Sequence, residues 1–310
     1  MIINTGQRTD IPAFYSKWFV NRIKEGFVYV RNPYFPNKVT KYILDSKVVD
    51  VIGFCTKNPE PMFKYLDELK EYKMLWYITI TAFSHDLEPN VCHVDKAIES
   101  FKFLSSKLGK NCVSLRYTPI IVNDRYPVER HIKAFEYILS NLSGYTNLCA
   151  FGFVDLYDKI KKNHPEIKDC SDEDKIRITL EFKKIAAKYN IKLRLCSKEK
   201  WLSKYGIDVQ GCMRLEDYEA AACNSLYPKN IMQARKGYCA CMLANDIGAY
   251  NCCMHLCKYC YANSNPQSVY NNYKLHDDNS PLLIGNINSN DVITEVVGES
   301  WIVKNEGIFK

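Results

Sequence analysis

Residues 48–56 read Val48-Val49-Asp50-Val51-Ile52-Gly53-Phe54-Cys55-Thr56. This nearly continuous apolar run predicts a strand that is buried on both faces of a sheet. A helix is predicted over residues 59–72, and a second apolar run over residues 75–83 predicts the next strand. Two apolar strands joined through a helix are typical of a parallel sheet that is covered by helices. This part of the chain therefore indicates an α/β fold.

The same alternation of strands and helices extends through the first 200 residues. Further strands are predicted over residues 2–5, 113–117, 148–153 and 192–196, with helices over residues 11–23, 94–108, 128–142 and 171–189. Asp10 and Ser171 are suitable N-caps for two of these helices. Residues 27–30 and 39–43 predict a hairpin. Six such strand–helix units favour a TIM-type (β/α) barrel, whole or incomplete, over a three-layer sandwich.

The periodic pattern ends after residue 200. Residues 201–310 are rich in Cys, Asn and Tyr and contain few periodic helices. We therefore expect two parts: a barrel body over residues 1–200, and a Cys-rich C-terminal segment, residues 201–310, packed on the barrel mouth. No Gly-x-Gly-x-x-Gly follows the first strand and no Walker-type loop is present, which argues against a dinucleotide-binding domain.

The composition bounds the class of protein. Of the 310 residues, 47% are hydrophobic and 25% charged, which excludes disordered and collagen-like chains. The longest apolar run is about half of a membrane-spanning helix, and the first residues lack the pattern of a signal peptide. We expect a cytoplasmic protein without a membrane partner. The net charge of +7 permits a nucleic-acid partner, although solvated lysines explain it more simply.

Cysteine is the unusual component of the sequence. Six of the 14 cysteines lie between Cys239 and Cys260, and three of them, Cys253, Cys257 and Cys260, have the spacing C-x3-C-x2-C. Three thiolates on a short loop suit one face of a 4Fe–4S cluster and leave the fourth iron without a cysteine. The alternatives are structural zinc, which prefers four closed ligands, and cysteines that bind no metal.

A second set of cysteines precedes the first along the chain. Its members are Cys196, Cys212, Cys239 and Cys241. They could hold a second cluster or a zinc ion, and the alternative is that a cysteine such as Cys196 is a buried core residue. The cysteines in or beside predicted strands are expected in the core; these are Cys55, Cys92, Cys112 and Cys149.

Polar side chains follow several of the predicted strands, and the carboxyl ends of barrel strands form the functional face of such folds. These candidate catalytic residues are Arg8, Asp10, Lys57, Asn58, Arg116, Asp155 and Tyr157. Cations that converge on one mouth suit a carboxylate or phosphate group. The expected substrate is therefore a small anionic or nucleotide-like molecule. Tyr259 is a candidate cofactor-binding residue, because a tyrosine can donate a hydrogen bond or stack on a base. The alternative is a structural ion-pair network with Asp10 as an N-cap.

An ordered set of motifs resembles a known family. The motifs are Thr9-Asp10-Ile11-Pro12-Ala13-Phe14-Tyr15, Val30-Arg31-Asn32-Pro33, Thr56-Lys57-Asn58-Pro59, Asp86-Leu87-Glu88-Pro89-Asn90-Val91, Arg116-Tyr117, Phe153-Val154-Asp155-Leu156-Tyr157, Asp246-Ile247-Gly248-Ala249-Tyr250 and Cys257-Lys258-Tyr259-Cys260-Tyr261-Ala262-Asn263. They resemble the bacterial family called domain of unknown function 1848. The resemblance implies an iron–sulfur barrel protein similar to radical S-adenosylmethionine (SAM) enzymes or spore photoproduct lyase, without naming a reaction.

The sequence departs from the usual radical SAM plan in two ways, and from the opening motif of the family it resembles in a third. The C-x3-C-x2-C loop lies about 50 residues from the C-terminus instead of after the first strand. No Gly-Gly-Glu segment, which would hold the SAM amino group, follows a second strand. Gln7-Arg8 stands where the family usually has two arginines, so Arg8 alone supplies that cation.

Three hypotheses of function follow. The first is a radical SAM-like enzyme, which would need an electron donor of the flavodoxin or ferredoxin type. The second is a non-radical cluster enzyme, in which the open iron acts as a Lewis acid or transfers sulfur. The third is a non-enzymatic protein, in which zinc or a cluster has a structural or redox-sensing role.

Overall fold

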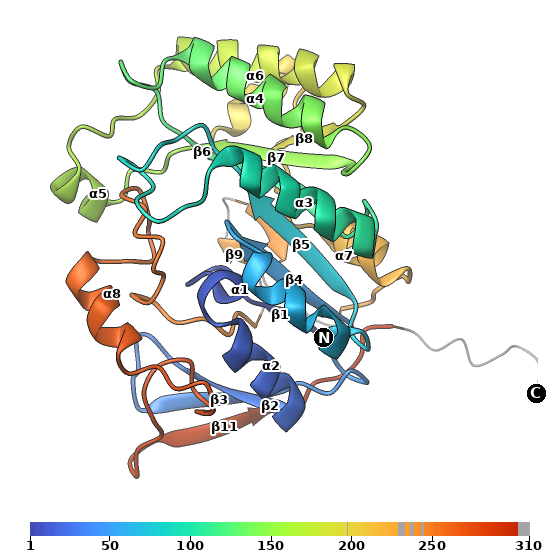
Figure 1. Ribbon diagram of the computed structural model, residues 1–310, viewed down its shortest axis with the longest axis vertical. Coiled ribbons are helices and arrows are strands. Elements are labelled where there is room, and N and C mark those ends of the chain that lie inside the picture. The colour runs from blue at the N-terminus through green and yellow to red at the C-terminus, as the bar shows by residue number, and fades with distance from the viewer. Residues whose placement is uncertain (197, 229–232, 236–238, 243–244, 303–310) are drawn as a thin grey trace, which may run out of the picture.

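The computed structural model describes residues 1–196, 198–228, 233–235, 239–242 and 245–302. Its centre is a six-stranded parallel sheet with the order β1-β4-β5-β6-β7-β8 (Figure 1). The strands are β1 (Ile2–Asn4), β4 (Val51–Thr56), β5 (Met74–Thr79), β6 (Val113–Ile120), β7 (Leu148–Phe153) and β8 (Lys192–Leu195). The α/β class with a parallel sheet is therefore confirmed.

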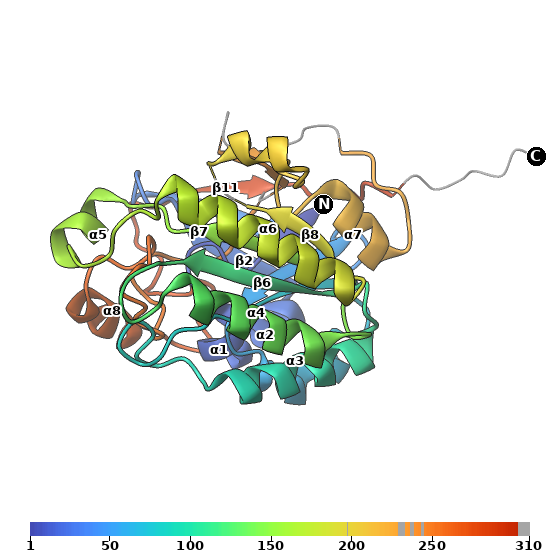
Figure 2. The same cartoon turned by 90° about the horizontal axis from the view of Figure 1, so that it is seen from above.

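The crossover helices pack on one face of this sheet, where α3, α4 and α6 lie side by side (Figure 2). The helices are α1 (Ile11–Phe14), α2 (Ser16–Glu25), the 3-10 helix η1 (Glu60–Leu69), α3 (Val94–Leu108), α4 (Val128–Leu142) and α6 (Asp172–Lys188). Alternate strand residues such as Phe54 and Trp76 point to this face and stack with ring centroids 4.0 Å apart. Caps set two helix starts, because Asp10 accepts a hydrogen bond from the Ala13 N–H and Ser171 accepts one from the Asp174 N–H.

The opposite face of the sheet is covered by the Cys-rich part of the chain. Leu75 and Tyr77 of β5 pack there with Met213, Met242 and helix α7 (Leu215–Ala222). A strand order that follows the chain, with all crossovers on one face, is the topology from which (β/α) barrels are built. The inner side of this sheet is thus filled by side chains of α7 and its neighbours.

The sheet does not close, so the prediction of a whole TIM-type barrel is wrong. Strands β1 and β8 remain the two edges. Irregular segments pair with these edges instead of further strands, since Asn4 forms a parallel bridge with Asp246 and Arg194 forms one with Asp208. The physical reason is that the edges of β1 and β8 are occupied by these irregular segments, whereas a TIM-type barrel is closed by eight strands.

A second, three-stranded sheet lies beyond α2, with the order β11-β3-β2. The hairpin predicted from sequence is confirmed as the antiparallel pair β2 (Phe27–Arg31) and β3 (Lys38–Ile43), and β11 (Val292–Val296) joins β3 in parallel. The remaining elements are α5 (Asp158–Asn163), η2 (Lys200–Tyr205), β9 (Gln233–Arg235), β10 (Cys239–Met242) and α8 (Pro266–Tyr273). The division of the chain at residue 200 stays a prediction.

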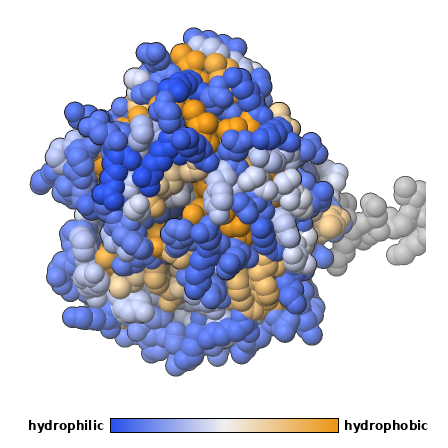
Figure 3. All heavy atoms as spheres, turned by 45° about the horizontal axis from the view of Figure 1, so that its top comes forward, coloured by the Kyte–Doolittle hydropathy of each residue, from blue (hydrophilic) through white to orange (hydrophobic). Residues whose placement is uncertain are grey.

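No helix within the described residues has the length and apolar character needed to cross a bilayer. The face of the molecule seen in Figure 3 is mostly hydrophilic, and its hydrophobic residues form separate small groups. Scattered apolar residues of this kind are normal on a protein surface.

One buried histidine makes the stability of the fold depend on pH. His131 of α4 is fully buried, with Nδ1 2.9 Å from the Tyr117 hydroxyl and Nε2 2.9 Å from the Ile121 carbonyl oxygen. Burial lowers the pKa of His131 from 6.5 to about 4. Between these values the unfolded chain binds a proton that the folded chain excludes. We expect this difference to lower the free energy of unfolding by up to about 3 kcal/mol as the pH falls from 6.5 to 4.

Urea unfolding at pH values across this interval measures the effect. The His131→Gln variant should lose that part of the pH dependence, whereas His93→Gln should keep it, because the His93 side chain is 78% exposed. If the free energy of unfolding depended on pH equally in the wild type and in His131→Gln, His131 would not be the group responsible.

Candidate active site

A cavity of about 560 Å³ lies where the parallel strands end. In Figure 2 the head of the β6 arrow points to the side where α5 and α8 lie. Ligands of open α/β sheets bind at this edge. Most of the candidate site residues from the sequence lie together at this edge. Their catalytic and ligand roles stay predictions. Those lining the cavity are Arg8, Asp10, Lys57, Arg116, Asp155, Tyr157, Cys196, Cys212, Cys241, Cys253, Cys257, Tyr259 and Cys260.

Asn58 is not among the residues that line the cavity. Asn58 is turned to its own backbone, since its side-chain oxygen accepts a hydrogen bond from the Glu60 N–H at 3.2 Å and so supports the start of η1. The side chain of Cys239 lies outside the described residues.

The C-x3-C-x2-C cysteines, hereafter the loop triad (Cys253, Cys257 and Cys260), sit on an irregular segment. Its backbone is held at several points: the Asn263 amide donates to the Cys253 carbonyl at 2.7 Å, and the Lys258 N–H donates to the Leu87 carbonyl at 3.0 Å. Burial raises the pKa of Cys253 well above its ordinary value, and nearby Asp10 and the other loop cysteines add to this rise. Because Cys253 prefers the thiol form here, it needs a nearby cation, such as a metal, before it can become a thiolate.

His255, inside the loop triad, ties the loop to the first helix. Its Nε2 lies 2.9 Å from Asp10 Oδ2, and its Nδ1 lies 3.1 Å from the Asn90 carbonyl oxygen. Asp10 Oδ2 also accepts the Lys57 N–H at 2.7 Å, while Oδ1 caps α1. One carboxylate therefore connects three segments of the cavity wall, so Asp10 acts as both the predicted cap and a support for the loop.

Lys57 is paired with a buried carboxylate beside the loop triad. Its Nζ lies 2.9 Å from Glu88 Oε1, and the same oxygen accepts hydrogen bonds from Thr81 and Tyr259. Although burial lowers the pKa of Lys57, the charges of Glu88 and of a Cys257 thiolate raise it more, so the pKa is raised overall. The cavity thus contains a permanent cation next to Cys257.

A second group, hereafter the compact triad, consists of Cys196, Cys212 and Cys241. The sulfur of Cys212 lies 3.0 Å from that of Cys196 and 3.5 Å from that of Cys241, and all three sulfurs lie within 4.8 Å of one another. Among the described residues, these are the Cys, His or carboxylate ligand atoms that lie close enough together to bind one metal ion. The sulfurs of the loop triad are more widely spaced.

Arg116 projects from β6 among these sulfurs. Its Nη1 lies 3.9 Å from the Cys55 sulfur, and its Nε is buried without a hydrogen-bond partner in the described part of the chain. Burial lowers the pKa of Arg116, but the charges of thiolates at Cys212 and Cys196 raise it more, so the pKa is raised well above its usual value. This guanidinium is a cation with unused donor capacity at the cavity wall.

Arg8, the third cation that lines the cavity, forms an ion pair with Asp246, which was not among the candidate site residues from the sequence. Its Nε lies 2.8 Å from Asp246 Oδ1, and Asp246 also accepts the Gln7 and Gly248 N–H groups. Arg8 therefore holds the β1 edge to the segment before the loop triad while lining the cavity.

Aromatic side chains complete one part of the wall. The rings of Tyr157 and Tyr261 lie 5.9 Å apart, and both residues line the cavity with Asp155. Lys159 of α5 donates to the carbonyl oxygens of Tyr261 and Asn263, which attaches α5 to the end of the loop segment.

A comparison with known families supports the resemblance that the ordered motifs indicate. A family model described as "Domain of unknown function (DUF1848)" matches residues 2–262. The chain belongs to the DUF1848 family. The matched region contains both triads and ends just after Cys260, so the cavity lies within the family domain. No curated protein and no solved structure matches this DUF1848 chain.

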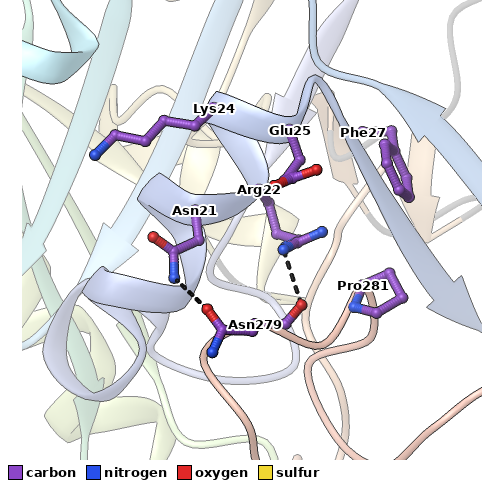
Figure 4. Close-up of a pocket in the computed structure, with 7 residues that line it drawn as sticks. All are labelled: Asn21, Arg22, Lys24, Glu25, Phe27, Asn279 and Pro281. Atoms are coloured by element: carbon purple, nitrogen blue, oxygen red, sulfur yellow. Dashed lines mark hydrogen bonds between the residues drawn. The ribbon is translucent and has the colours of Figure 1, made fainter.

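A smaller cavity of about 350 Å³ lies between the end of α2 and residues 279–281 of the DUF1848 chain (Figure 4). Its polar groups bond to one another, since Arg22 donates to the Asn279 carbonyl at 3.0 Å and Asn21 donates to the Asn279 side chain at 3.4 Å. None of the cysteines whose side chains are described lines it. The larger cavity is therefore the candidate active site.

Besides Asp246, two supporting residues of this DUF1848 site, Glu88 and His255, were not among the candidates from the sequence. Glu88 lies within the motif Asp86-Leu87-Glu88-Pro89-Asn90-Val91, and His255 lies between the first two loop cysteines. Their positions inside motifs were the signal that could have identified them. Neither follows a predicted strand, which was the criterion used for the other polar residues.

Proposed function

We propose that this DUF1848 protein is an iron–sulfur enzyme in which the loop triad holds a 4Fe–4S cluster at the cavity. The supporting observation is that Cys253, Cys257 and Cys260, from a segment far along the chain, line the same cavity as the ends of the parallel strands. Their donor set fits, because three soft sulfur ligands on one short loop suit iron. Their spacing, wider than that of the compact triad, also fits a cluster better than one ion.

Three thiolates leave one iron of such a cluster without a protein ligand. With SAM at that iron, the cluster would supply one electron for the reductive cleavage of SAM, which makes a radical that abstracts hydrogen from a substrate. The electron would come from a flavodoxin- or ferredoxin-type donor.

The protein's own residues would bind and orient the reactants. Lys57 keeps a positive charge beside Cys257 and would bind a carboxylate or phosphate group, with Glu88 fixing its position. His255 and Asp10 would hold the loop in place. The pair Tyr157 and Tyr261 would pack against a base or ring and exclude water from that side. We infer a small anionic substrate, nucleotide-like where it contacts these rings.

Anaerobic purification followed by iron and sulfide analysis tests the cluster, and electron paramagnetic resonance of the reduced protein with and without SAM tests the reaction class. We expect about four irons at the loop triad and a spectrum that changes with SAM. Iron and sulfide without any effect of SAM would contradict the radical mechanism and favour the Lewis-acid or sulfur-transfer hypothesis. Protein without sulfide under these conditions would contradict the cluster.

A further inference from the structure

The compact triad has the dimensions of a site for one metal ion. In a tetrahedral zinc site, with zinc–sulfur bonds of about 2.3 Å, neighbouring sulfurs lie about 3.8 Å apart. Two of the three sulfur–sulfur distances are below that spacing, at 3.0 and 3.5 Å for the pairs with Cys212, and the sulfurs of Cys196 and Cys241 lie within 4.8 Å of each other. Sulfurs that bind different irons of a cubane lie farther apart, so this group suits a single ion.

We propose that Cys196, Cys212 and Cys241 bind one divalent metal ion of the zinc class, with the fourth coordination position open to the cavity. All three residues line the cavity, and among the described residues no fourth Cys, His or carboxylate ligand belongs to the group. Three protein ligands with an exchangeable fourth position are typical of catalytic zinc, whereas structural zinc is closed by four. The open position would bind water or an anionic oxygen of a small molecule.

The charge of the surrounding residues fits this assignment. Three thiolates and a divalent ion have a net charge of −1, and buried net charge is costly unless it is paired. Arg116 supplies one positive charge among these cysteines, and its buried Nε has no hydrogen-bond partner in the described residues. The metal-bound site and Arg116 together are neutral, whereas three neutral thiols would give this guanidinium no negative charge from the triad.

Buried groups around the triad hold it in position. The Cys212 N–H donates to the Cys241 sulfur at 3.2 Å, a bond that favours a thiolate there. The Cys212 carbonyl accepts hydrogen bonds from the Tyr77 hydroxyl at 2.7 Å and from Arg194 at 3.3 Å. Such outer contacts orient metal ligands before the metal binds. The site therefore does not depend on the loop triad or its cluster.

Zinc analysis tests the site separately from the cluster. In the background Cys253→Ala/Cys257→Ala/Cys260→Ala, which lacks the loop triad, we expect about one zinc per chain. Adding Cys212→Ser should reduce zinc to background, while adding Cys149→Ser, a buried cysteine on β7, should not. Circular dichroism checks that each variant is folded. Absence of zinc and of iron from the folded parent variant, with Cys196 and Cys212 recovered as a disulfide, would overturn the proposal.

Cobalt(II) substitution in the same background tests the ligands through its spectrum, and azide together with the Cys239→Ala variant tests the open position. We expect a thiolate-to-cobalt charge-transfer band, d–d bands of tetrahedral intensity, and a change in those bands when sodium azide is added. No thiolate band would overturn metal binding by the triad. An azide-insensitive spectrum, or loss of cobalt in Cys239→Ala, would overturn the open position and indicate a closed site.

Arg116 variants test the charge argument. Arg116→Met should weaken zinc binding by about tenfold or more, as loss of outer-shell partners does in other zinc sites, and Arg116→Lys should restore much of the affinity. Equal affinity in Arg116→Met and wild type would show that the guanidinium does not balance the site.

Discussion

Cys257→Ala is expected to remove essentially all cluster iron and acid-labile sulfide from anaerobically purified protein. The proposed cluster has three protein thiolates, and the loss of one leaves two irons without a protein ligand in a cavity open to solvent. The same change also removes a negative partner of Lys57. Iron, sulfide and visible absorption measured against protein concentration give the result directly.

Cys252→Ala is the matched control for this experiment. Cys252 is adjacent to the loop triad in sequence and fully buried, but its sulfur lies 2.9 Å from the Ala249 carbonyl oxygen and it does not line the cavity. We expect its iron and sulfide content to match the wild type. Retention of the cluster in Cys257→Ala would instead show that these cysteines are not its ligands.

Asp217→Ala is expected to lower the free energy of unfolding by about 3 kcal/mol, because it removes the buried partner of Arg194 and leaves that charge with only the more exposed Glu216 and Asp208. Asp217 Oδ2 lies 2.6 Å from Arg194 Nη1 and also accepts hydrogen bonds from the Tyr77 hydroxyl and the Arg214 N–H. The Arg194 side chain is only 2% exposed, so water cannot replace the lost carboxylate. Urea unfolding followed by circular dichroism measures the change.

Glu216→Ala provides the comparison, because Glu216 pairs with the same Arg194 from the exposed side. Its side chain is 51% exposed, and pairs of this kind contribute about 1 kcal/mol or less. Similar losses for Asp217→Ala and Glu216→Ala would show that burial does not set the strength of this network.

Asp217→Ala should also weaken metal binding at the compact triad, since Tyr77 and Arg194 both hold the Cys212 carbonyl.

The repeating part of the fold could be predicted from the sequence. Helices α3 and α4 have the bounds expected from their apolar periodicity, and β7 was predicted residue for residue. The single helix expected over residues 11–23 is broken at Tyr15, which has φ −133° and whose hydroxyl donates to the Cys252 carbonyl at 2.6 Å. A long-range contact of this kind leaves no trace in helical periodicity.

Barrel closure could not be predicted, because it depends on segments without periodicity. Apolar strands of a barrel and of an open sheet have the same pattern, and what occupies the gap is decided by contacts such as Asn4 with Asp246. The position of the site could be predicted better. Lys57 follows β4, and Arg116 is near the end of the strand expected over residues 113–117, although β6 continues to Ile120. Neighbouring parallel strands bring these two residues to the same cavity. Glu88 and His255 support the site through side-chain contacts that no spacing rule predicts.

The gap between β1 and β8 has a consequence for producing the protein. Backbone hydrogen bonds join β1 to Asn245 and Ile247, and β8 to Asp208, and two ligands of the compact triad, Cys212 and Cys241, lie between these contacts along the chain. Detachment of this segment would expose two edge strands, and unpaired edges promote aggregation between molecules. Cultures poor in metal should therefore yield insoluble protein rather than soluble inactive protein.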